Sequence, residues 1–349
     1  MIAPAGRRGW VRHAGVGVLG LWLAASGAAQ PLPIAAAAVG VTPQPLHEAE
    51  VRRWFARIHV AAQSLNYQGT LVSSADGVLS SARVAHFHDG HGSFERVEVL
   101  DGRRQRTYRH NDQVTTLWPQ QRVAVVEQRE SRLASLRQVL EPRAGQHYRV
   151  FEQGTGHVAG REAMLLLLRP TDDLRFGQRL WVDAQTALVL RTDVLGPRDQ
   201  VLESSAFSQV EIGMKAKPAS VLQPMRQLDG WQRVLPAQVP TRLDAEGWTL
   251  SDPVPGFELT GCARRSLGPA AGRVDESAVM QAVYSDGLTH VSLFFEPIGE
   301  RRARGPMQAQ NGATHTLMQP IGGDWWVTAV GDVPSATLRR FLQALQRKN

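Results

Sequence analysis

One short stretch of the chain resembles a metal site more than any other. It contains three histidines and one aspartate, namely His86, His88, Asp89 and His91. Imidazole and carboxylate groups are common ligands of zinc and other transition metals. Residues two apart on a strand point to one face, so His86 and His88 would point together. The alternative is a half-exposed hairpin tip, because three ligands in one hairpin seldom converge without outer-shell support. We therefore predict neither a metal site nor a cofactor.

Arginines are concentrated just after these histidines. Guanidinium groups bind phosphates bidentately, so arginines beside an apolar cavity would suit a phosphorylated lipid headgroup, although a solvated strand face remains the alternative. Only Tyr108 lies among the arginines from Arg103 to Arg109, and so few aromatic rings argue against stacking on single-stranded nucleic acid. The arginines are Arg103, Arg104, Arg106, Arg109, Arg122 and Arg129.

Motifs that would indicate an enzyme are missing. The chain has no Gly-x-Ser-x-Gly elbow, no phosphate-binding Gly-Lys-Ser/Thr loop and no His-Glu-x-x-His helix. Gly15, Gly17 and Gly20 fit the dinucleotide-binding pattern, but no strand precedes them. A hydrolase whose triad is dispersed along the chain stays open as an alternative, but no nucleophile is nominated. We predict a protein that is not an enzyme.

Composition describes a basic chain of ordinary globular content. It has 349 residues, a net charge of +7 and 43% hydrophobic residues. Its length allows two cores, and its charge favours anionic partners such as a lipid surface or an acidic protein segment. Cys262 is the only cysteine, so no intramolecular disulfide can form.

The N-terminus is typical of a secretory signal peptide. Arg7, Arg8 and Arg12 precede an apolar run, Ala14–Ala29, that ends in small residues. The run is shorter than the about 20 residues of a spanning helix, although an uncleaved anchor remains an alternative. We predict a cleaved signal peptide at 1–29, leaving general and twin-arginine export open, and a disordered spacer at 30–45 rich in alanine and proline.

Elements able to position these side chains follow as a long antiparallel meander. Asp-Gly and Asn-Asp pairs separate short strands and suit the positive φ angles of tight hairpins. A preceding helix, Leu46–Leu65, carries one apolar stripe, and we expect it to cover the concave side of this meander. The predicted strands are Asn66–Ser74, Val78–Asp89, His91–Asp101, Arg103–His110, Gln113–Trp118 and Gln121–Gln128.

After a second predicted helix, Ser131–Leu140, the strand pattern resumes. Met164–Leu168 is apolar at every position, which indicates a strand covered on both faces. Together these elements predict one β-rich domain over 46–213. The additional strands are His147–Glu152, Gly160–Arg169, Gly177–Asp183, Ala187–Leu195 and Gln200–Ile212.

Residues 214–240 lose this pattern and contain several prolines, so we interpret them as a linker. A smaller α/β domain follows over 241–349 and closes with a helix, Pro334–Gln346. Gly299–Gln310 is predicted to be a basic loop. The strands of the second domain are Gly256–Ala263, Val279–Ser285, Thr289–Glu296, Ala313–Met318 and Trp325–Val330.

Several short motifs stand in order along nearly the whole mature chain. In the first domain they are Leu65–Thr70, Glu95-Arg96, Leu100–Gly102, Val158–Arg161 and Arg179–Asp183. In the second domain they are Tyr284–Leu288, Val291–Phe294, Gly312–Thr314, Val327–Gly331 and Val333-Pro334. Together these motifs resemble the RseB/MucB family of periplasmic regulators of the envelope-stress sigma factor.

This resemblance implies an α+β protein with a large unclosed antiparallel β-barrel of LolA/LolB type and covering helices, joined to a smaller α/β domain. It also implies a periplasmic protein that binds the periplasmic segment of an anti-sigma factor, shields it from the site-1 protease, and releases it when lipid or lipopolysaccharide binds. Ala184–Ala187 departs from the family by lacking a turn glycine, and Gly299–Gln310 departs by being unusually basic.

Candidate site residues follow from strand parity and from this resemblance. A lipid or lipoprotein carrier remains the alternative function, and self-association remains open. The predicted acyl-chain lining is Tyr67, Leu71, Phe87, Leu117, Trp118 and Val125, with Arg103, Arg104 and Arg106 at the headgroup. The predicted contacts with the anti-sigma segment are the linker and a hairpin that contains Tyr284, Asp286, Gly287, Leu288, Phe294 and Phe295.

Overall fold

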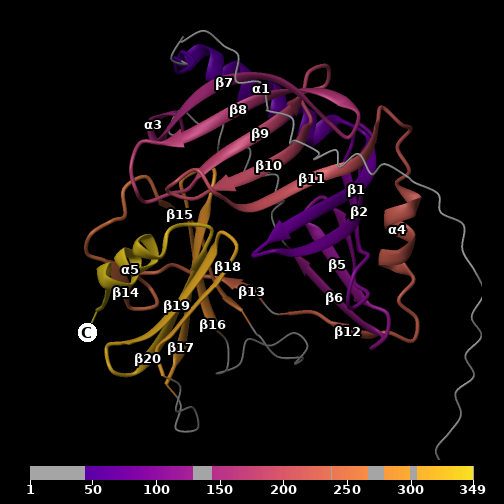
Figure 1. The fold of residues 1–349 in the computed structure, drawn as a ribbon. Coiled ribbons are helices and arrows are strands. Elements are labelled where there is room, and N and C mark those ends of the chain that lie inside the picture. Colours follow the sequence, from indigo (N-terminus) through magenta and orange to yellow (C-terminus); the bar gives the residue numbers. More distant parts are fainter. Residues whose placement is uncertain (1–43, 129–143, 237, 266–278, 299–304, 349) are drawn as a thin grey trace, which may run out of the picture. The chain divides into compact units, whose positions relative to one another are not determined.

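The computed structural model describes residues 44–128, 144–236, 238–265, 279–298 and 305–348 (Figure 1). Every described residue belongs to one compact unit, Pro43–Asn349. The predicted signal peptide, most of the predicted spacer and the predicted helix Ser131–Leu140 lie outside the described residues. Across the described ranges, every helix is too short or too polar to cross a membrane.

A twelve-stranded sheet is the largest element (Figure 1). Its spatial order is β12-β6-β5-β4-β3-β2-β1-β11-β10-β9-β8-β7, and its end strands β12 and β7 do not pair within the described residues. All neighbours pair antiparallel except β12 and β6. The predicted unclosed sheet is therefore confirmed. The strands are β1 (Tyr67–Ala75), β2 (Val78–His88), β3 (Ser93–Val99), β4 (Arg106–His110), β5 (Gln113–Trp118), β6 (Val123–Gln128), β7 (Tyr148–Val158), β8 (Arg161–Pro170), β9 (Gly177–Asp183), β10 (Val189–Leu195), β11 (Val201–Ile212) and β12 (Gln232–Val234).

Tight turns connect the strands of the meander, as the sequence predicts. Asp76 and Gly77 have φ angles of 48° and 76°, and Asn111 has 52°. Short polar side chains and glycine tolerate this left-handed region. The turn between β9 and β10, which lacks the expected glycine, instead holds Ala187 at a φ of 61°. Asp183 braces that turn by accepting hydrogen bonds from the Thr186 N–H and hydroxyl, each at 2.7 Å.

Helix α1 (Glu48–Ser64) packs against a different part of the sheet from the one predicted. Its buried stripe, with Phe55 and Ile58 at its centre, lies in one cluster with Leu166 and Leu168 of β8. The expectation that α1 covers the meander following it is therefore wrong for its buried stripe, although the helix also contacts β2 of the meander. The apolar run of β8 needs cover on two faces, and Leu166, Leu167 and Leu168 are all buried as predicted. The four-residue helix α3 (Ala144–His147) precedes β7.

Residues 214–240 are folded rather than open. Helix α4 (Ala219–Arg226) packs on β3 and β4 with Val221 completely buried, and β12 and β13 (Gln238–Pro240) follow it. The stretch predicted as a linker therefore contains one helix and two short strands that the sequence did not predict. Its prolines suggested irregular structure, but proline is compatible with the start of a helix and with sheet edges.

The second sheet is antiparallel and has seven strands, in the order β13-β15-β16-β17-β20-β19-β18. Helix α5 (Ser335–Ala344) covers it through Leu338, Phe341 and Leu342, and a two-stranded pair of β14 (Trp248–Leu250) and β21 (Leu345–Arg347) adjoins it. The remaining strands are β15 (Glu258–Arg265), β16 (Val279–Ser285), β17 (His290–Pro297), β18 (Met307–Asn311), β19 (Thr314–Ile321) and β20 (Trp325–Gly331).

The five strands and the final helix predicted for this part of the chain are confirmed. The predicted basic loop Gly299–Gln310 is wrong at its end, where β18 begins at Met307. Strands β13, β14 and β21 were not predicted. Each has only three residues, which is too short to show an alternating pattern.

Candidate functional site

Strand register divides the predicted acyl-chain lining between the two faces of the first sheet. Tyr67 pairs with His86, and the pairs continue across β3, β4 and β5 to Glu127 on β6. Directly paired residues share a face, so Tyr67, Leu71, Trp118 and Val125 lie together. Phe87 and Leu117 have the opposite parity. The prediction of one shared lining is therefore wrong for these two residues, because successive residues of a strand, such as Leu117 and Trp118 of β5, point to opposite faces.

Phe87 and Leu117 lie under helix α4. They form a buried cluster with Tyr108 and Ala124 from the sheet and Val221 from the helix. The exposed fractions of Phe87 and Leu117 are 1% and 5%. Both residues are therefore part of a closed core, and α4 occupies the space in which they were expected to contact a ligand.

The three predicted headgroup arginines do not converge. Arg106 lies on the face of α4, where its Nη2 is 3.1 Å from Glu98, which also pairs with Arg83. Arg103 and Arg104 are exposed in the turn between β3 and β4. Arg106 is therefore one member of a cross-strand ion-pair row, and only Arg103 and Arg104 remain available at the end of the sheet.

A polar row crosses the face that carries Tyr67. The Tyr67 and His86 rings stack at 5.4 Å, and Arg109 Nε lies 3.4 Å from Glu95. His86 is 2% exposed, and its Nδ1 lies 2.8 Å from the Leu65 carbonyl oxygen, so Nδ1 carries the proton and donates it. Burial lowers the pKa of His86, and burial together with Glu95 raises the pKa of Tyr67 above its usual value. Strand parity could have found this row.

The histidine run does not assemble a metal site within the part of the chain that the structure describes. No group of three histidine, cysteine or acidic side chains there is close enough to hold an ion. His88 Nδ1 accepts from the Gly90 N–H, and Asp89 Oδ1 accepts from the His91 and Gly92 N–H groups. These side chains therefore stabilise the β2–β3 turn.

The hairpin predicted to bind a partner is buried instead. Tyr284 and Phe295 belong to the core under α5, with 5% and 0% of their surface exposed. Asp286 is 4% exposed, Gly287 forms the turn at a φ of 94°, and Phe294 is half-buried on the opposite face of the sheet. Most of the residues named for partner contact are therefore buried, as is usual for aromatic residues on a strand, and their contact with a partner stays a prediction.

Asp286 joins this hairpin to the first sheet. Its Oδ2 accepts hydrogen bonds from Arg175 Nη1 at 2.8 Å and from the Tyr148 hydroxyl at 3.0 Å. Its Oδ1 accepts from the N–H groups of Leu288 and Thr289, which closes the turn. We call Tyr148, Arg175 and Asp286 the buried joint.

Arg175 is fully enclosed, with none of its side chain exposed. Its Nε donates to Asp172 at 3.0 Å and its Nη2 donates to the Pro255 carbonyl at 2.8 Å. The guanidinium also lies over the rings of Tyr148 and Phe257, at 5.8 and 5.0 Å. A charge buried this deeply is stable only with such complete pairing. Burial and Asp286 also raise the pKa of Tyr148 well above its usual range.

Beside the buried joint, each of the two hydrophobic cores receives one leucine from the other part of the chain. Leu288 of the hairpin packs on the cluster formed by α1, β7, β8 and β9. Leu174, from the loop between β8 and β9, lies in the core of the second sheet, and its carbonyl accepts a 2.7 Å hydrogen bond from the Thr337 hydroxyl. Each core therefore includes an apolar side chain from the other sheet.

Two further contacts join the sheets away from the buried joint. The Gly312 N–H donates to Asp76 at 2.7 Å, and Arg265 lies 3.4 Å from Glu127. Gly312 has a φ of 58°, and a Cβ there would come within 2.9 Å of the Ala75 side chain. Glycine is therefore required where the β18–β19 turn meets the β1–β2 turn.

Comparison with known proteins agrees with this architecture. The model of the MucB/RseB N-terminal domain matches residues 50–225, and the model of the MucB/RseB C-terminal domain matches 242–346. The chain is 30% identical over 309 residues to the sigma factor AlgU regulatory protein MucB of Pseudomonas aeruginosa, covering 85% of this chain and 91% of the relative. It is 20% identical over 292 residues to the sigma-E factor regulatory protein RseB of Haemophilus influenzae, covering 82% and 88%.

Solved structures show the same arrangement. A crystal structure of MucB in complex with MucA(peri) matches with a TM-score of 0.64 and 26% identity, covering 86% of this chain and 99% of that one. A structure of the Pseudomonas aeruginosa MucA/MucB complex matches with a TM-score of 0.63, 25% identity and coverage of 86% and 99%. The fold is that of a two-part protein, an unclosed sheet joined through a buried contact to a smaller sheet. The chain belongs to the MucB/RseB family of sigma-factor regulatory proteins.

Proposed function

We propose that this protein is exported to the periplasm and there binds the periplasmic segment of a membrane anti-sigma factor. The observation that carries this proposal is the likeness to MucB in complex with MucA(peri), which covers both sheets and 86% of the chain. Bound protein would shield the segment from its first proteolytic cleavage, because a protease needs its substrate extended and accessible. The sigma factor would then stay inhibited while the complex lasts.

Lipid or lipopolysaccharide is the proposed release signal, acting on the first sheet. Support comes from the sheet face with Tyr67, Leu71, Trp118 and Val125. At the end of this sheet Val78 and Leu79 are each 69% exposed and Leu100 is 44% exposed, close in sequence to the exposed Arg103 and Arg104. Burying an acyl chain contributes about 0.8 kcal/mol per methylene, and guanidinium groups bind phosphate.

The buried joint is the proposed route by which occupancy of the first sheet affects the second. Tyr148 begins β7 and Arg175 lies in the loop between β8 and β9, so both are connected to strands that carry the α1 cluster. A ligand that changes this cluster would act on Asp286 and the hairpin. Coupling between two sites is typically about 1–3 kcal/mol, or about 5–150-fold in affinity.

A direct binding experiment tests this function. The exported protein is titrated into the labelled periplasmic segment of the anti-sigma factor from the same organism, and the segment is then exposed to its site-1 protease with and without the protein. We expect saturable binding and slower cleavage. If the segment does not bind while the protein still captures lipid, the function is that of a lipid or lipoprotein carrier.

A further inference from the structure

Strand β15 has one edge that is only partly paired. It pairs with β16 from Glu258 to Arg265, but with β13 only from Ala263 to Arg265. One more hydrogen bond, from the Thr241 N–H to the Cys262 carbonyl at 3.0 Å, continues the ladder. Within the described residues, Leu259–Gly261 therefore has no strand beside it on this edge.

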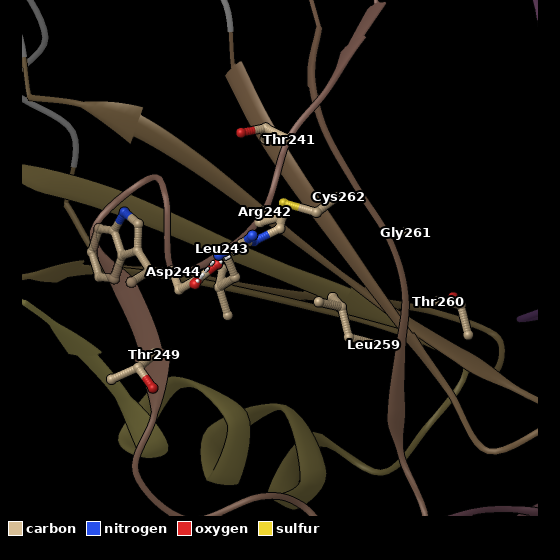
Figure 2. Close-up of a pocket in the computed structure, with 10 residues that line it drawn as sticks. Thr241, Arg242, Leu243, Asp244, Thr249, Leu259, Thr260, Gly261 and Cys262 are labelled. Carbon is tan, nitrogen blue, oxygen red and sulfur yellow. Dashed lines mark hydrogen bonds and ion pairs between the residues drawn. The ribbon is translucent and has the colours of Figure 1, made fainter.

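A cavity of about 490 Å³ lies beside this edge (Figure 2). Thr241–Asp244 line one side and Leu259–Cys262 the other, with Trp248 and Thr249 completing the wall. Continuing the register of β13 would place Thr241 to Asp244 opposite Cys262 to Leu259. The cavity is therefore a fork, the place where β13 separates from β15.

Fixed contacts hold the fork open. Leu243 turns away from β15 into the core, where its carbonyl accepts a 3.0 Å hydrogen bond from the Trp248 N–H. Arg242 Nε donates to Asp244 at 3.0 Å, which fastens the turn, as Figure 2 shows. Because these bonds already exist, an incoming chain would find the space pre-organised.

The chemistry of the fork suits an extended, mostly uncharged peptide. The separated edge presents main-chain N–H and C=O groups, which are best satisfied by another strand. Leu259 is 44% exposed, and a Cβ on Gly261 would meet nothing within 4 Å, so a backbone can approach closely. The charged wall residues Arg242 and Asp244 neutralise each other. Three residues of free edge measure about 10 Å, and the register shift between Leu259 and Gly261 gives this edge a β-bulge at Thr260.

We propose that this fork binds an extended stretch of the anti-sigma segment, which adds as a strand to Leu259–Gly261 of β15. The inference rests on the proposed function and deepens it, because it assigns the grip on the partner to the edge of β15. The buried hairpin of β16 and β17 then has a structural role, and the fork is the docking surface on the second sheet.

Cys262 provides a direct test because it lines the fork and is the only cysteine in the chain. Burial raises the pKa of this thiol to about 11, so labelling with iodoacetamide is followed at pH 9. We expect saturating anti-sigma segment to slow labelling at least tenfold. The control is Cys262→Ser combined with Gln308→Cys on β18, at the other edge of the same sheet, whose labelling should not change.

A second test fills the fork. Gly261→Leu places a side chain in open space without backbone strain, so it should fold normally and weaken binding of the segment at least tenfold. Gly156→Leu on β7 is the matched control, because a Cβ there also meets nothing within 4 Å. If the wild-type protein binds the segment but Cys262 is labelled at the same rate and Gly261→Leu does not weaken binding, the fork is not the docking site, while the proposed function still stands. Failure of the wild-type protein to bind would overturn the proposed function and the fork together.

Discussion

Replacing Asp286 with asparagine should destabilise the protein strongly. The asparagine amide keeps the shape of the side chain, and its oxygen can still accept from the Leu288 and Thr289 N–H groups. The substitution leaves Arg175, which has no exposed side-chain surface, without its closest counter-charge. Breaking a buried ion pair costs about 3–5 kcal/mol. Asp172 remains bonded to Arg175 and is partly exposed, so we expect a loss of about 3 kcal/mol.

Urea denaturation of the wild-type protein and three variants measures this effect. The variants are Asp286→Asn, Arg175→Met and the double substitution. Removing both charges leaves no buried charge unpaired, so the double variant should be more stable than the sum of the single losses predicts, by about 2 kcal/mol. Asp244→Asn is the control, because the Arg242–Asp244 pair is exposed and should add nothing measurable.

Two results would refute this reasoning. If Asp286→Asn unfolded at the same urea concentration as the wild-type protein, the ion pair between Arg175 and Asp286 would not stabilise the fold. Strictly additive losses in the double variant would mean that the two side chains do not depend on each other. The proposed coupling adds a functional outcome, namely that the double variant still binds the anti-sigma segment but responds less to lipopolysaccharide.

Three further predictions test other contacts. Tyr148→Phe removes one hydrogen bond to a charged acceptor and should cost about 1.5–3 kcal/mol in urea denaturation; an unchanged midpoint would contradict the 3.0 Å contact with Asp286. His86, whose pKa burial lowers, faces Glu95 and has His88 nearby. His86 takes up a proton near pH 6.5 in the unfolded chain but resists protonation in the folded chain, so the free energy of unfolding should fall as the pH drops below about 6.5. The fall should be smaller in His86→Asn. Parallel curves of unfolding free energy against pH for the two proteins would exclude His86 as the cause. Gly312→Val should lower stability by about 1–2 kcal/mol, because its φ is 58° and its side chain would approach Ala75. Gly322→Val is the control, because Gly322 also has a positive φ but has open space around it, so no steric contact is added. Equal losses in the two variants would show that the Ala75 contact does not matter.

Local pattern predicted most of the strands well. β5 and β16 match their predicted ranges to the residue, since alternating side chains and Asp-Gly or Asn-Asp turns are encoded within a few positions. The pairing partner of α1 was not predictable in this way. Its stripe shows that one face is buried, but β8 lies about a hundred residues further on, and adjacency in sequence favoured the wrong strands.

Site residues were harder to predict than strands. The lining prediction required a register across five hairpins, and it placed Leu117 and Trp118 on one face although successive residues of a strand alternate between faces. Phe87 and Leu117 lie on the face of α4. The buried joint was invisible in the sequence because Tyr148, Arg175 and Asp286 are far apart in the chain and meet only in the fold. The resemblance of Tyr284–Leu288 to the family directed attention to this hairpin as a partner contact, whereas the structure shows Tyr284 and Asp286 buried.

We propose above that the binding of lipid and the affinity for the anti-sigma segment are linked. The most direct measurement is the dissociation constant of the exported protein for the labelled segment, determined without lipopolysaccharide and at a saturating concentration of it. The account predicts saturable binding that lipopolysaccharide weakens by about 5–150-fold. An unchanged dissociation constant while lipopolysaccharide is bound would contradict the linkage, and absence of binding under both conditions would contradict the regulator function itself.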